Sequence, residues 1–375
     1  MVIHPEHKVD GSFDGTSGTT LRIRLPDQFT VRKNSWTMAV QAQSEQVVTL
    51  THGTPYGVDL EFNHDEIMFA LGNERAWEEI SSRKIEPAIA GMISTVEADI
   101  LVARTKDIYQ LTGTAGSVVG ASGDTSAVGL ARAKLNQQAV PMEYRSVQLD
   151  SVTMATIVNG QKAIFNPQAD VSKAFREGYY GRAYQSDWYE NERTYAHTAG
   201  TDHTTVTVND ASIASGDTTI TTAGANVTVG TVFTFSGDAV KDVHPETKQS
   251  YAHDKQFVIT AVNGNDWTFS PAYITTGPLQ NVSKLPTTGQ AITLHGAANS
   301  VLQQNLMYHR DAFVVVNAAP PVLDSAEKCM VKRQENLAFR VWMGSDIVNS
   351  RLLLRLDTVF GSLTARPSFA CRISN

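Results

Sequence analysis

Alternating apolar and polar positions near the start of the chain predict short β-strands. Arg22 and Arg24 alternate with three aliphatic residues, and Pro26 follows the run. A period of two is typical of a strand with one face exposed to solvent. A second run over 47–51 ends at a His-Gly pair. We therefore predict two strands in this part of the chain.

A third alternating run places acidic residues on a further strand. Over 58–62, Asp59 and Glu61 alternate with apolar residues. Opposite charges on facing strands stabilise a ribbon. We therefore interpret residues 19–65 as a long hairpin or small antiparallel ribbon, with residues 1–18 as a short N-terminal segment.

The pattern then changes to a helical period. Ile93, Val96 and Ile100 recur at intervals of three and four, which predicts one apolar face of an amphipathic helix over about 87–110. A proline stands where this helix begins, and proline is tolerated only in the first turn. We expect the three residues to be buried against a sheet. With a shorter helix after it, this helix makes residues 66–140 a helical region.

The next part of the chain mixes the two periods. Within 141–200 we predict strands over 147–149 and 152–158, separated by a turn, and a short helix over 165–178. A segment dense in aromatic residues and glycine closes this region.

A compositional change marks an insertion. Over 201–296, Thr, Val, Gly and Asp dominate, and turn signals separate strand-like runs about every ten residues. This pattern predicts a small all-β barrel or sandwich inserted into the surrounding fold. Residues 297–375 return to the earlier character, with a helix favoured over 297–306 and strands after it.

Composition and charge narrow the class of protein. With 42% hydrophobic and 18% charged residues, the chain has a globular composition and is not intrinsically disordered. A formal net charge of -7 argues against a protein that coats nucleic acid by charge. Neither a membrane span nor a secretory signal is visible. Two cysteines fit a reducing compartment and do not make a disulfide-stapled fold.

Motifs for catalysis are absent from the sequence. It has no glycine-rich phosphate loop, no zinc-protease motif and no nucleophile elbow. We interpret the remaining clusters of polar residues as solvated loops, turns and inert thiols. These are the possible metal ligands His197, Asp202 and His203, the possible paired carboxylates Asp187, Glu190 and Glu192, and His244, His253, Cys329 and Cys371. We therefore expect no catalytic residue, no cofactor and no metal.

Seven segments, in order along the chain, carry a likeness to a known family. They cover 21–32, 84–101, 133–149, 181–201, 229–261, 304–320 and 355–373. In this order they resemble the major capsid proteins of short-tailed phages of the P22 coat type. Examples are the strand LRIRLPDQFTVR, the helix start KIEPAIAGMISTVEADIL and the C-terminal RLDTVFGSLTARPSFACRI.

The resemblance implies an α+β fold of the Hong Kong 97 capsid type. Its E-loop would be the ribbon 19–65, and its P-domain, with the long spine helix, would be 66–140. Its A-domain would take 141–200 and part of 297–375, with C-terminal P-domain strands in the remainder. An all-β barrel, the I-domain, would be the insertion 201–296.

The resemblance also implies a function. A major capsid protein of this type self-assembles as hexamers and pentamers into the icosahedral head shell that encloses the double-stranded DNA of a tailed phage. Scaffolding protein and portal would be its partners, without a membrane, in a virion assembled in the host cytoplasm. Two alternatives remain: an encapsulin-like compartment shell, which generally lacks the insertion, and a carbohydrate-binding or carbohydrate-active β-protein, which the missing catalytic motifs disfavour.

The ribbon supplies the candidate contacts between subunits. A two-stranded ribbon alone is marginally stable in water, so it must lie on another surface. In the family that surface is the P-domain of an adjacent subunit. We therefore expect Arg22 and Arg24 to meet acidic residues of a neighbouring chain or of the opposite ribbon strand, with Asp59 and Glu61 as candidates.

Overall fold

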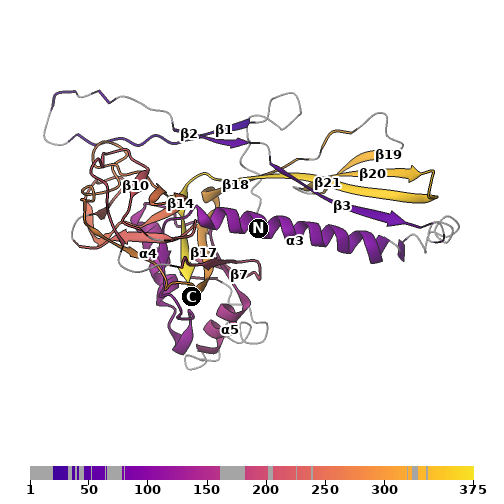
Figure 1. The fold of residues 1–375 in the computed structure, drawn as a ribbon, viewed down its shortest axis with the longest axis horizontal. Coiled ribbons are helices and arrows are strands. Elements are labelled where there is room, and N and C mark those ends of the chain that lie inside the picture. The colour runs from indigo at the N-terminus through magenta and orange to yellow at the C-terminus, as the bar shows by residue number, and fades with distance from the viewer. Residues whose placement is uncertain are drawn as a thin grey trace. The chain divides into compact units, whose positions relative to one another are not determined.

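The computed structural model divides the chain into two compact units. It describes residues 20–32, 36–38, 40–41, 46–51, 53–63, 65, 78–79, 81–160, 182–201, 206–224, 226–237, 240–318, 320–322, 328–334 and 337–375. Unit 1 comprises residues 1–25, 47–100 and 313–363, and unit 2 comprises residues 26–46, 101–312 and 364–375. Figure 1 shows strands in both units and a single long helix.

Unit 1 contains a two-stranded ribbon, β1 (Thr20–Leu25) with β2 (Gln46–Thr51). Both predicted strands are confirmed. Arg22 and Arg24 are exposed, whereas Ile23 and Leu25 are half-buried. The ribbon therefore has the polar and apolar faces that the alternation predicts.

The main sheet of unit 1 has five strands, four of them in the order β18-β21-β20-β19, with β3 paired to β21. The strands are β3 (Thr54–Phe62), β18 (Phe313–Ala318), β19 (Lys328–Gln334), β20 (Leu337–Asp346) and β21 (Arg351–Thr364). The prediction that the third run belongs to the ribbon of β1 is wrong. Thr54 to Phe62 pairs antiparallel with Phe360 to Leu352, so nine residues of β3 use the long edge of β21.

The long helix α3 runs from Glu86 to Lys106, after a π-helical turn over Ser81–Ile85. The predicted proline, Pro87, is the second residue of α3, which follows the π-helical turn directly. The helix ends four residues before the expected position. There the N–H of Asp107 donates to the Arg104 carbonyl, a tighter bond that closes the last turn.

Unit 2 is built on a seven-stranded sheet in the order β4-β22-β17-β5-β7-β6, with β8 paired to β17. Its strands are β4 (Leu111–Thr112), β5 (Arg145–Leu149), β6 (Arg182–Ala183), β7 (Ser186–Glu190), β8 (Tyr195–Thr198), β17 (Val301–His309) and β22 (Ala370–Ser374). Helices α4 (Ser126–Gln137) and α5 (Ser151–Gly160) supply apolar side chains to its core. Short 3-10 turns are η2 (Ala121–Gly123), η4 (Arg310–Ala312) and η5 (Pro367–Phe369).

The strand predicted over 152–158 is instead α5. Asp150 precedes the helix, and its carboxylate accepts a hydrogen bond from the N–H of Thr153 at 3.1 Å, which is an N-cap. Met154 and Ile157, one turn apart, are buried in the sheet core. The β-branched residues of this segment suggested a strand, but the cap and the packing favour a helix.

The helix predicted over 297–306 is also wrong, because the chain forms the central strand β17 from Val301 onward. β17 has strand partners on both sides. Its buried amides are hydrogen-bonded: Gln304 donates to Ser374 Oγ at 3.1 Å, and Asn305 accepts from the Asp150 N–H at 2.8 Å. Buried polar residues interrupt the apolar pattern and hid this strand. The helix predicted over 165–178 lies outside the described residues.

The insertion forms a separate sheet within unit 2, in the order β10-β15-β14-β11-β16-β9. Its strands are β9 (Val206–Thr207), β10 (Thr219–Thr221), β11 (Val232–Phe235), β14 (Phe257–Asn263), β15 (Asp266–Ser270) and β16 (Ala291–Leu294). β12 (Lys241–Val243) and β13 (Ser250–Asp254) add a hairpin. The fold is therefore mixed α and β, with few helices.

Aromatic side chains fill the core of this inserted sheet. Phe257 is fully buried, and its ring lies 5.5 Å from Phe233, 5.7 Å from Phe235 and 5.6 Å from Phe269, centroid to centroid. Tyr273 completes the group at 5.2 Å. Aromatic rings at these separations add to the burial of apolar area. None of the described helices is both long enough and apolar enough to cross a lipid bilayer.

Candidate assembly surfaces

The acidic residues proposed to face Arg22 and Arg24 have other partners within the chain. Glu61 accepts from Arg351 on β21 at 2.8 Å, and Asp59 lies 3.9 Å from Arg355 on the same strand. The register of β3 with β21 brings these residues together. The expected pairing across the ribbon is therefore wrong. Contacts of Arg22 and Arg24 with a neighbouring chain stay a prediction.

The tip of the β20–β21 hairpin is an exposed apolar surface that the sequence analysis missed. Ile347 and Val348 are 96% and 85% exposed. Asp346 fixes the turn below them, because its carboxylate accepts from the N–H of Val348 at 3.0 Å and from Arg351 at 2.9 Å. Hydrogen bonds from Asn349 and Arg351 lower the pKa of Asp346. Two aliphatic side chains are thus held in solvent by an ordered turn.

The long helix packs on the unit 1 sheet through one face. Val96 and Ile100 are buried together with Phe360 of β21, and Ile93 is half-buried one turn earlier. Tyr56 of β3 packs against the same cluster, and its hydroxyl donates to Asp99 at 3.1 Å. Figure 1 shows α3 running along this sheet beside β3 and β21. Within the described residues, α3 therefore covers one face of the sheet.

The insertion leaves and re-enters the seven-stranded sheet at neighbouring points. Thr198 at the end of β8 pairs with Val301 at the start of β17. The ladder continues beyond them, since the N–H of Ala199 donates to the Ser300 carbonyl and that of Asn299 to the Gly200 carbonyl, at 2.9 and 3.0 Å. A segment whose ends meet in this way can fold around its own core.

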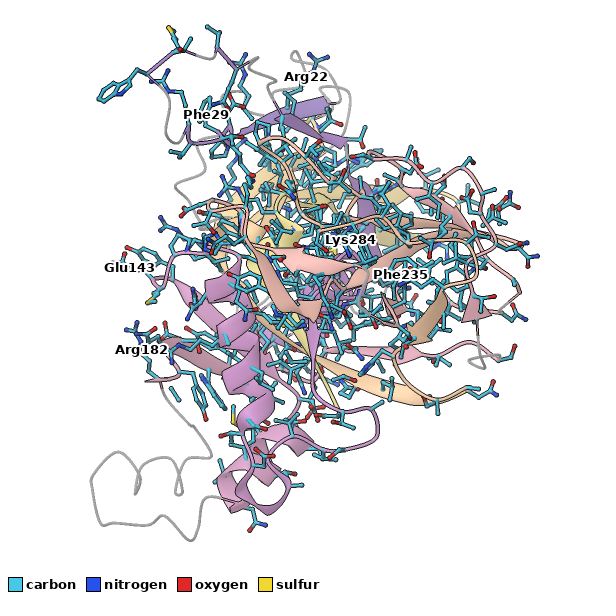
Figure 2. All side chains as sticks on the ribbon, turned by 90° about the vertical axis from the view of Figure 1, so that its left-hand side faces the viewer. Arg22, Phe29, Glu143, Arg182, Phe235 and Lys284 are labelled. Carbon is cyan, nitrogen blue, oxygen red and sulfur yellow. The ribbon has the colours of Figure 1, made fainter. Side chains whose placement is uncertain are left out.

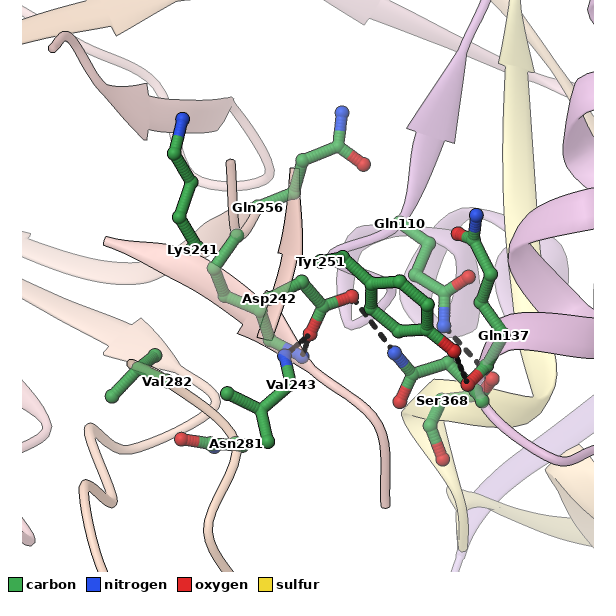
Figure 3. Close-up of polar contacts among 12 residues, drawn as sticks. Gln110, Gln137, Lys241, Asp242, Val243, Tyr251, Gln256, Asn281, Val282 and Ser368 are labelled. Carbon is green, nitrogen blue, oxygen red and sulfur yellow. Dashed lines mark hydrogen bonds and ion pairs between the residues drawn. The ribbon is translucent and has the colours of Figure 1, made fainter. Parts of the chain in front are cut away.

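A polar junction ties the insertion to α4 and to the sheet beneath it. Figure 3 shows the hydroxyl of Tyr251 donating to the Gln137 carbonyl at 3.1 Å. Gln138 donates to Asp242 at 2.9 Å. Arg372 of β22, fully buried, donates to the carbonyl of Gly230 in the insertion at 2.7 Å. Burial lowers the pKa of this guanidinium to about 10, although nearby acidic groups oppose the shift.

The centre of the junction is a buried ion pair. Lys255 Nζ lies 2.7 Å from Asp242 Oδ1 and 4.9 Å from the centre of the Tyr109 ring. Burial alone would raise the pKa of Asp242, but the Lys255 ammonium and the His253 side chain outweigh it and lower that pKa. Because Asp242 also accepts from Gln138, the carboxylate is well satisfied, as a buried charge requires.

The structure describes the surroundings of several residues that were considered for catalysis. His197 is buried between the Tyr195 hydroxyl at 2.9 Å and Thr231 Oγ1 at 3.1 Å. Asp187 lies 3.7 Å from Arg182 at the surface. Burial raises the pKa of Cys371 to about 11, which makes it a poor nucleophile. His203 lies outside the described residues, and among those described no three His, Cys, Asp or Glu side chains form a metal-binding group.

Comparison with models of protein families assigns the chain to a family. Residues 188–371 match the model described as "P22 coat protein - gene protein 5". The matched stretch begins in β7, contains the whole inserted sheet and ends in β22. The chain is a coat protein of the P22 type. The family resemblance of the sequence is thereby confirmed, and the protein is a major capsid protein that forms the phage head shell.

Solved structures similar to this coat protein come from phages. A structure titled "Mycobacterium phage Che8" is 11% identical, with a TM-score of 0.49 over 96% of this chain and 85% of that chain. The mature capsid of bacteriophage PhiM1 is 11% identical, with a TM-score of 0.47 over 96% and 82%. The CUS-3 coat protein I-domain is 26% identical, with a TM-score of 0.21 over 25% of this chain and 97% of that chain. The comparison with curated proteins gave no match.

Proposed function

We propose that this coat protein has the Hong Kong 97-type fold with an inserted I-domain. The P-domain is the helix–sheet layer of unit 1, built from α3 and the sheet of β3 and β18–β21. The A-domain is the seven-stranded sheet of unit 2, and the I-domain is the inserted sheet with its aromatic core. Support comes from the closed hydrogen-bonded neck at Gly200 and Asn299, which separates the insertion from the A-domain sheet.

The shell is built from hexamers and pentamers and encloses double-stranded DNA. Scaffolding protein and portal are the expected partners, with assembly in the host cytoplasm. The single observation that carries this proposal is the family match over residues 188–371, which contains the inserted sheet. The exposed aliphatic tip at Ile347 and Val348 is the kind of surface that a neighbouring subunit covers.

The protein acts through its surfaces and not as an enzyme. The polar side chains buried in unit 2, such as Asp242, Lys255 and Arg372, bond to one another or to the main chain and so hold the insertion in place. A cellular compartment shell is the second candidate, but the P22-type match covers the insertion, which compartment shells generally lack.

Electron microscopy of the expressed chain tests the proposal. The full chain is produced alone and together with the scaffolding protein of its phage, and particles are separated by sedimentation. We expect closed icosahedral shells when scaffolding protein is present, and DNA-filled heads with one tail vertex in infected cells. Small shells filled with a cargo protein would support the compartment, and subunits that never form shells would refute both.

A further inference from the structure

Three arginines from distant parts of the chain meet at one end of the seven-stranded sheet. Arg145 begins β5 and pairs in register with His309, the last residue of β17. Arg310 follows in η4, and Arg366 precedes η5, which leads into the neighbouring strand β22. The Arg366 N–H donates to the Ala312 carbonyl at 3.2 Å, which holds η5 beside η4. We call Arg145, Arg310 and Arg366 the arginine edge.

Two of the three guanidinium groups are stacked on aromatic rings. The guanidinium carbon of Arg310 lies 3.9 Å from the centre of the Tyr144 ring, and that of Arg366 lies 4.8 Å from the Phe369 ring. Tyr144 is 55% exposed, so the Arg310 stack lies at the surface. A stack uses the face of a guanidinium, whereas its N–H donors lie in the plane and suit the oxygens of a phosphate group.

The third arginine is buried beneath this surface. Arg145 is 1% exposed, and it donates through Nε to the Pro141 carbonyl at 2.8 Å and through Nη2 to the Val140 carbonyl at 2.6 Å. Its Nη1 is buried without a hydrogen-bond partner. Its charge therefore adds to the positive potential of the edge, with little screening by water.

Negative charge at this edge is sparse. Asp311 is shared, since its carboxylate lies 3.7 Å from Arg310 Nε and 3.6 Å from His309 Nδ1. Arg145 and Arg366 form no ion pair with any residue that the structure describes. Burial lowers the pKa of His309, and the three arginines add to that effect while Asp311 opposes it.

Two further charged side chains of unit 2 extend outward. Figure 2 shows Glu143 and Arg182 pointing into solvent. Glu143 adjoins Tyr144 in the chain, whereas Arg182 is already paired with Asp187. Arg132 contributes a further positive charge that acts on Arg145. The positive charges of this edge exceed the negative ones, in a chain whose net charge is -7.

We propose that the arginine edge binds the phosphate backbone of double-stranded DNA inside the head. This inference rests on the proposed function, because the shell supplies the DNA. Phosphates of DNA are neutralised by Arg and Lys without regard to base sequence, and such contacts need no pocket. A shell of acidic subunits repels the DNA that it encloses. Contact with the DNA is therefore most favourable at a local group of arginines.

An acidic segment of a protein is the other ligand that arginines attract. The proposed function favours DNA, because a shell that encloses double-stranded DNA presents phosphates to its subunits, whereas an acidic peptide would have to come from a separate protein. The guanidinium fork fits phosphate and carboxylate oxygens alike, so the two ligands are distinguished by comparing their binding directly.

Binding of a labelled DNA duplex of about 25 base pairs to the full-length subunit tests the proposal. Fluorescence anisotropy over a range of salt concentrations compares the wild type with Arg310→Gln/Arg366→Gln. We expect weaker binding and a fall of about 2 in the slope of log K against log salt, about 0.9 for each lost phosphate contact. The matched control, Arg193→Gln/Arg333→Gln, changes the net charge equally and should leave the slope unchanged.

Three further measurements separate the outcomes. Arg310→Lys/Arg366→Lys should restore the slope with lower affinity, and failure to restore it would overturn the proposal in favour of a structural role. Polyglutamate bound as tightly as DNA, with the same loss in the Gln variant, would overturn it in favour of a protein ligand. Equal slopes for variant and control would also overturn it. Closed shells from the Gln variant would show that head formation itself is intact.

Discussion

The inserted sheet of unit 2 and the main sheet of unit 1 are both antiparallel, but they are stabilised in different ways. The inserted sheet encloses fourteen buried apolar residues, among them Phe233, Phe257 and Trp267. Among the residues that the structure describes, the cluster beneath α3 in unit 1 contains three buried apolar residues, Val96, Ile100 and Phe360. In the described parts of the chain, the inserted sheet has a large core of its own, whereas α3 and its sheet form a layer with a smaller one, which we call the thin layer.

The strands of the unit 1 sheet also leave apolar side chains exposed. β20 is half-buried at every position except Ser345. Met330 and Leu353 of the same sheet are exposed, as is Ile347 in the turn between β20 and β21. Apolar area left in water destabilises a fold until something covers it. We infer that unit 1 gains part of its stability from neighbouring subunits, whereas the insertion is stable without them.

The largest expected effect comes from a charge placed in the thin layer. In Val96→Asp a carboxyl group replaces a buried methyl pair beside Phe360. Keeping that group protonated at pH 7, against an ordinary pKa of about 3.9, costs about 4 kcal/mol. We expect aggregation or loss of assembly in a sedimentation assay. The control Thr95→Asp, one residue away on the exposed face, should assemble normally, and wild-type yield from Val96→Asp would refute the assigned face.

An effect of similar size is expected in the aromatic core of the insertion. Phe257→Ala removes the ring that touches Phe233, Phe235 and Phe269, at a cost of about 3–5 kcal/mol. We expect the insertion to unfold at lower urea concentration by tryptophan fluorescence. The exposed control Val229→Ala should not shift the transition. If Phe257→Ala lowers the stability of α3 and its sheet equally, the two regions are not independent.

Periodic segments of this coat protein were predictable from sequence, because their pattern is local. The alternation around Arg22 predicted β1, and the spacing of Val96 and Ile100 predicted α3. The compositional change at 201–296 predicted strands, which the structure contains. In each case the period of the side chains follows directly from backbone geometry.

The failures arose where tertiary partners decide. The choice of β21 as the partner of β3 depends on residues almost 300 positions away, so Asp59 was assigned to the wrong neighbour. The buried side chains of Gln304 and Asn305 donate to partners far away in the sequence, Ser374 and Thr153 respectively. The arginine edge joins positions 145, 310 and 366. Each of these arginines stands beside an aromatic residue or close to one, at the end of a predicted strand. This is the only signal of the arginine edge in the sequence.

A third prediction concerns the ion pair that anchors the insertion. In Asp242→Asn the Lys255 ammonium stays buried without its partner, which we expect to cost about 3 kcal/mol at pH 7. The pKa of Asp242 is lowered in the folded state, so its contribution is present above about pH 4 and lost as the pH falls further.

The pH dependence distinguishes this pair from ordinary surface charges. Urea unfolding at pH 7 and at pH 3 should show a large difference between wild type and Asp242→Asn at pH 7 and a smaller one at pH 3. The exposed control Asp266→Asn should follow the wild type at both pH values. An equal deficit of Asp242→Asn at both pH values would mean that the asparagine disturbs packing and that the charge is unimportant.

The smallest effect per subunit is expected at the ribbon, and it tests whether unit 1 depends on its neighbours. Arg22 and Arg24 are exposed on β1, and the acidic residues of β3 already pair with β21. An exposed ion pair with a neighbouring chain contributes only about 0–1 kcal/mol, but a closed shell repeats it in every subunit. Arg22→Glu/Arg24→Glu should therefore keep a folded monomer by circular dichroism and lower shell yield, most strongly at low ionic strength, where repulsion is least screened. Wild-type yield at low salt would instead mean that the apolar face of the ribbon holds it, and the exposed arginines would be solvated.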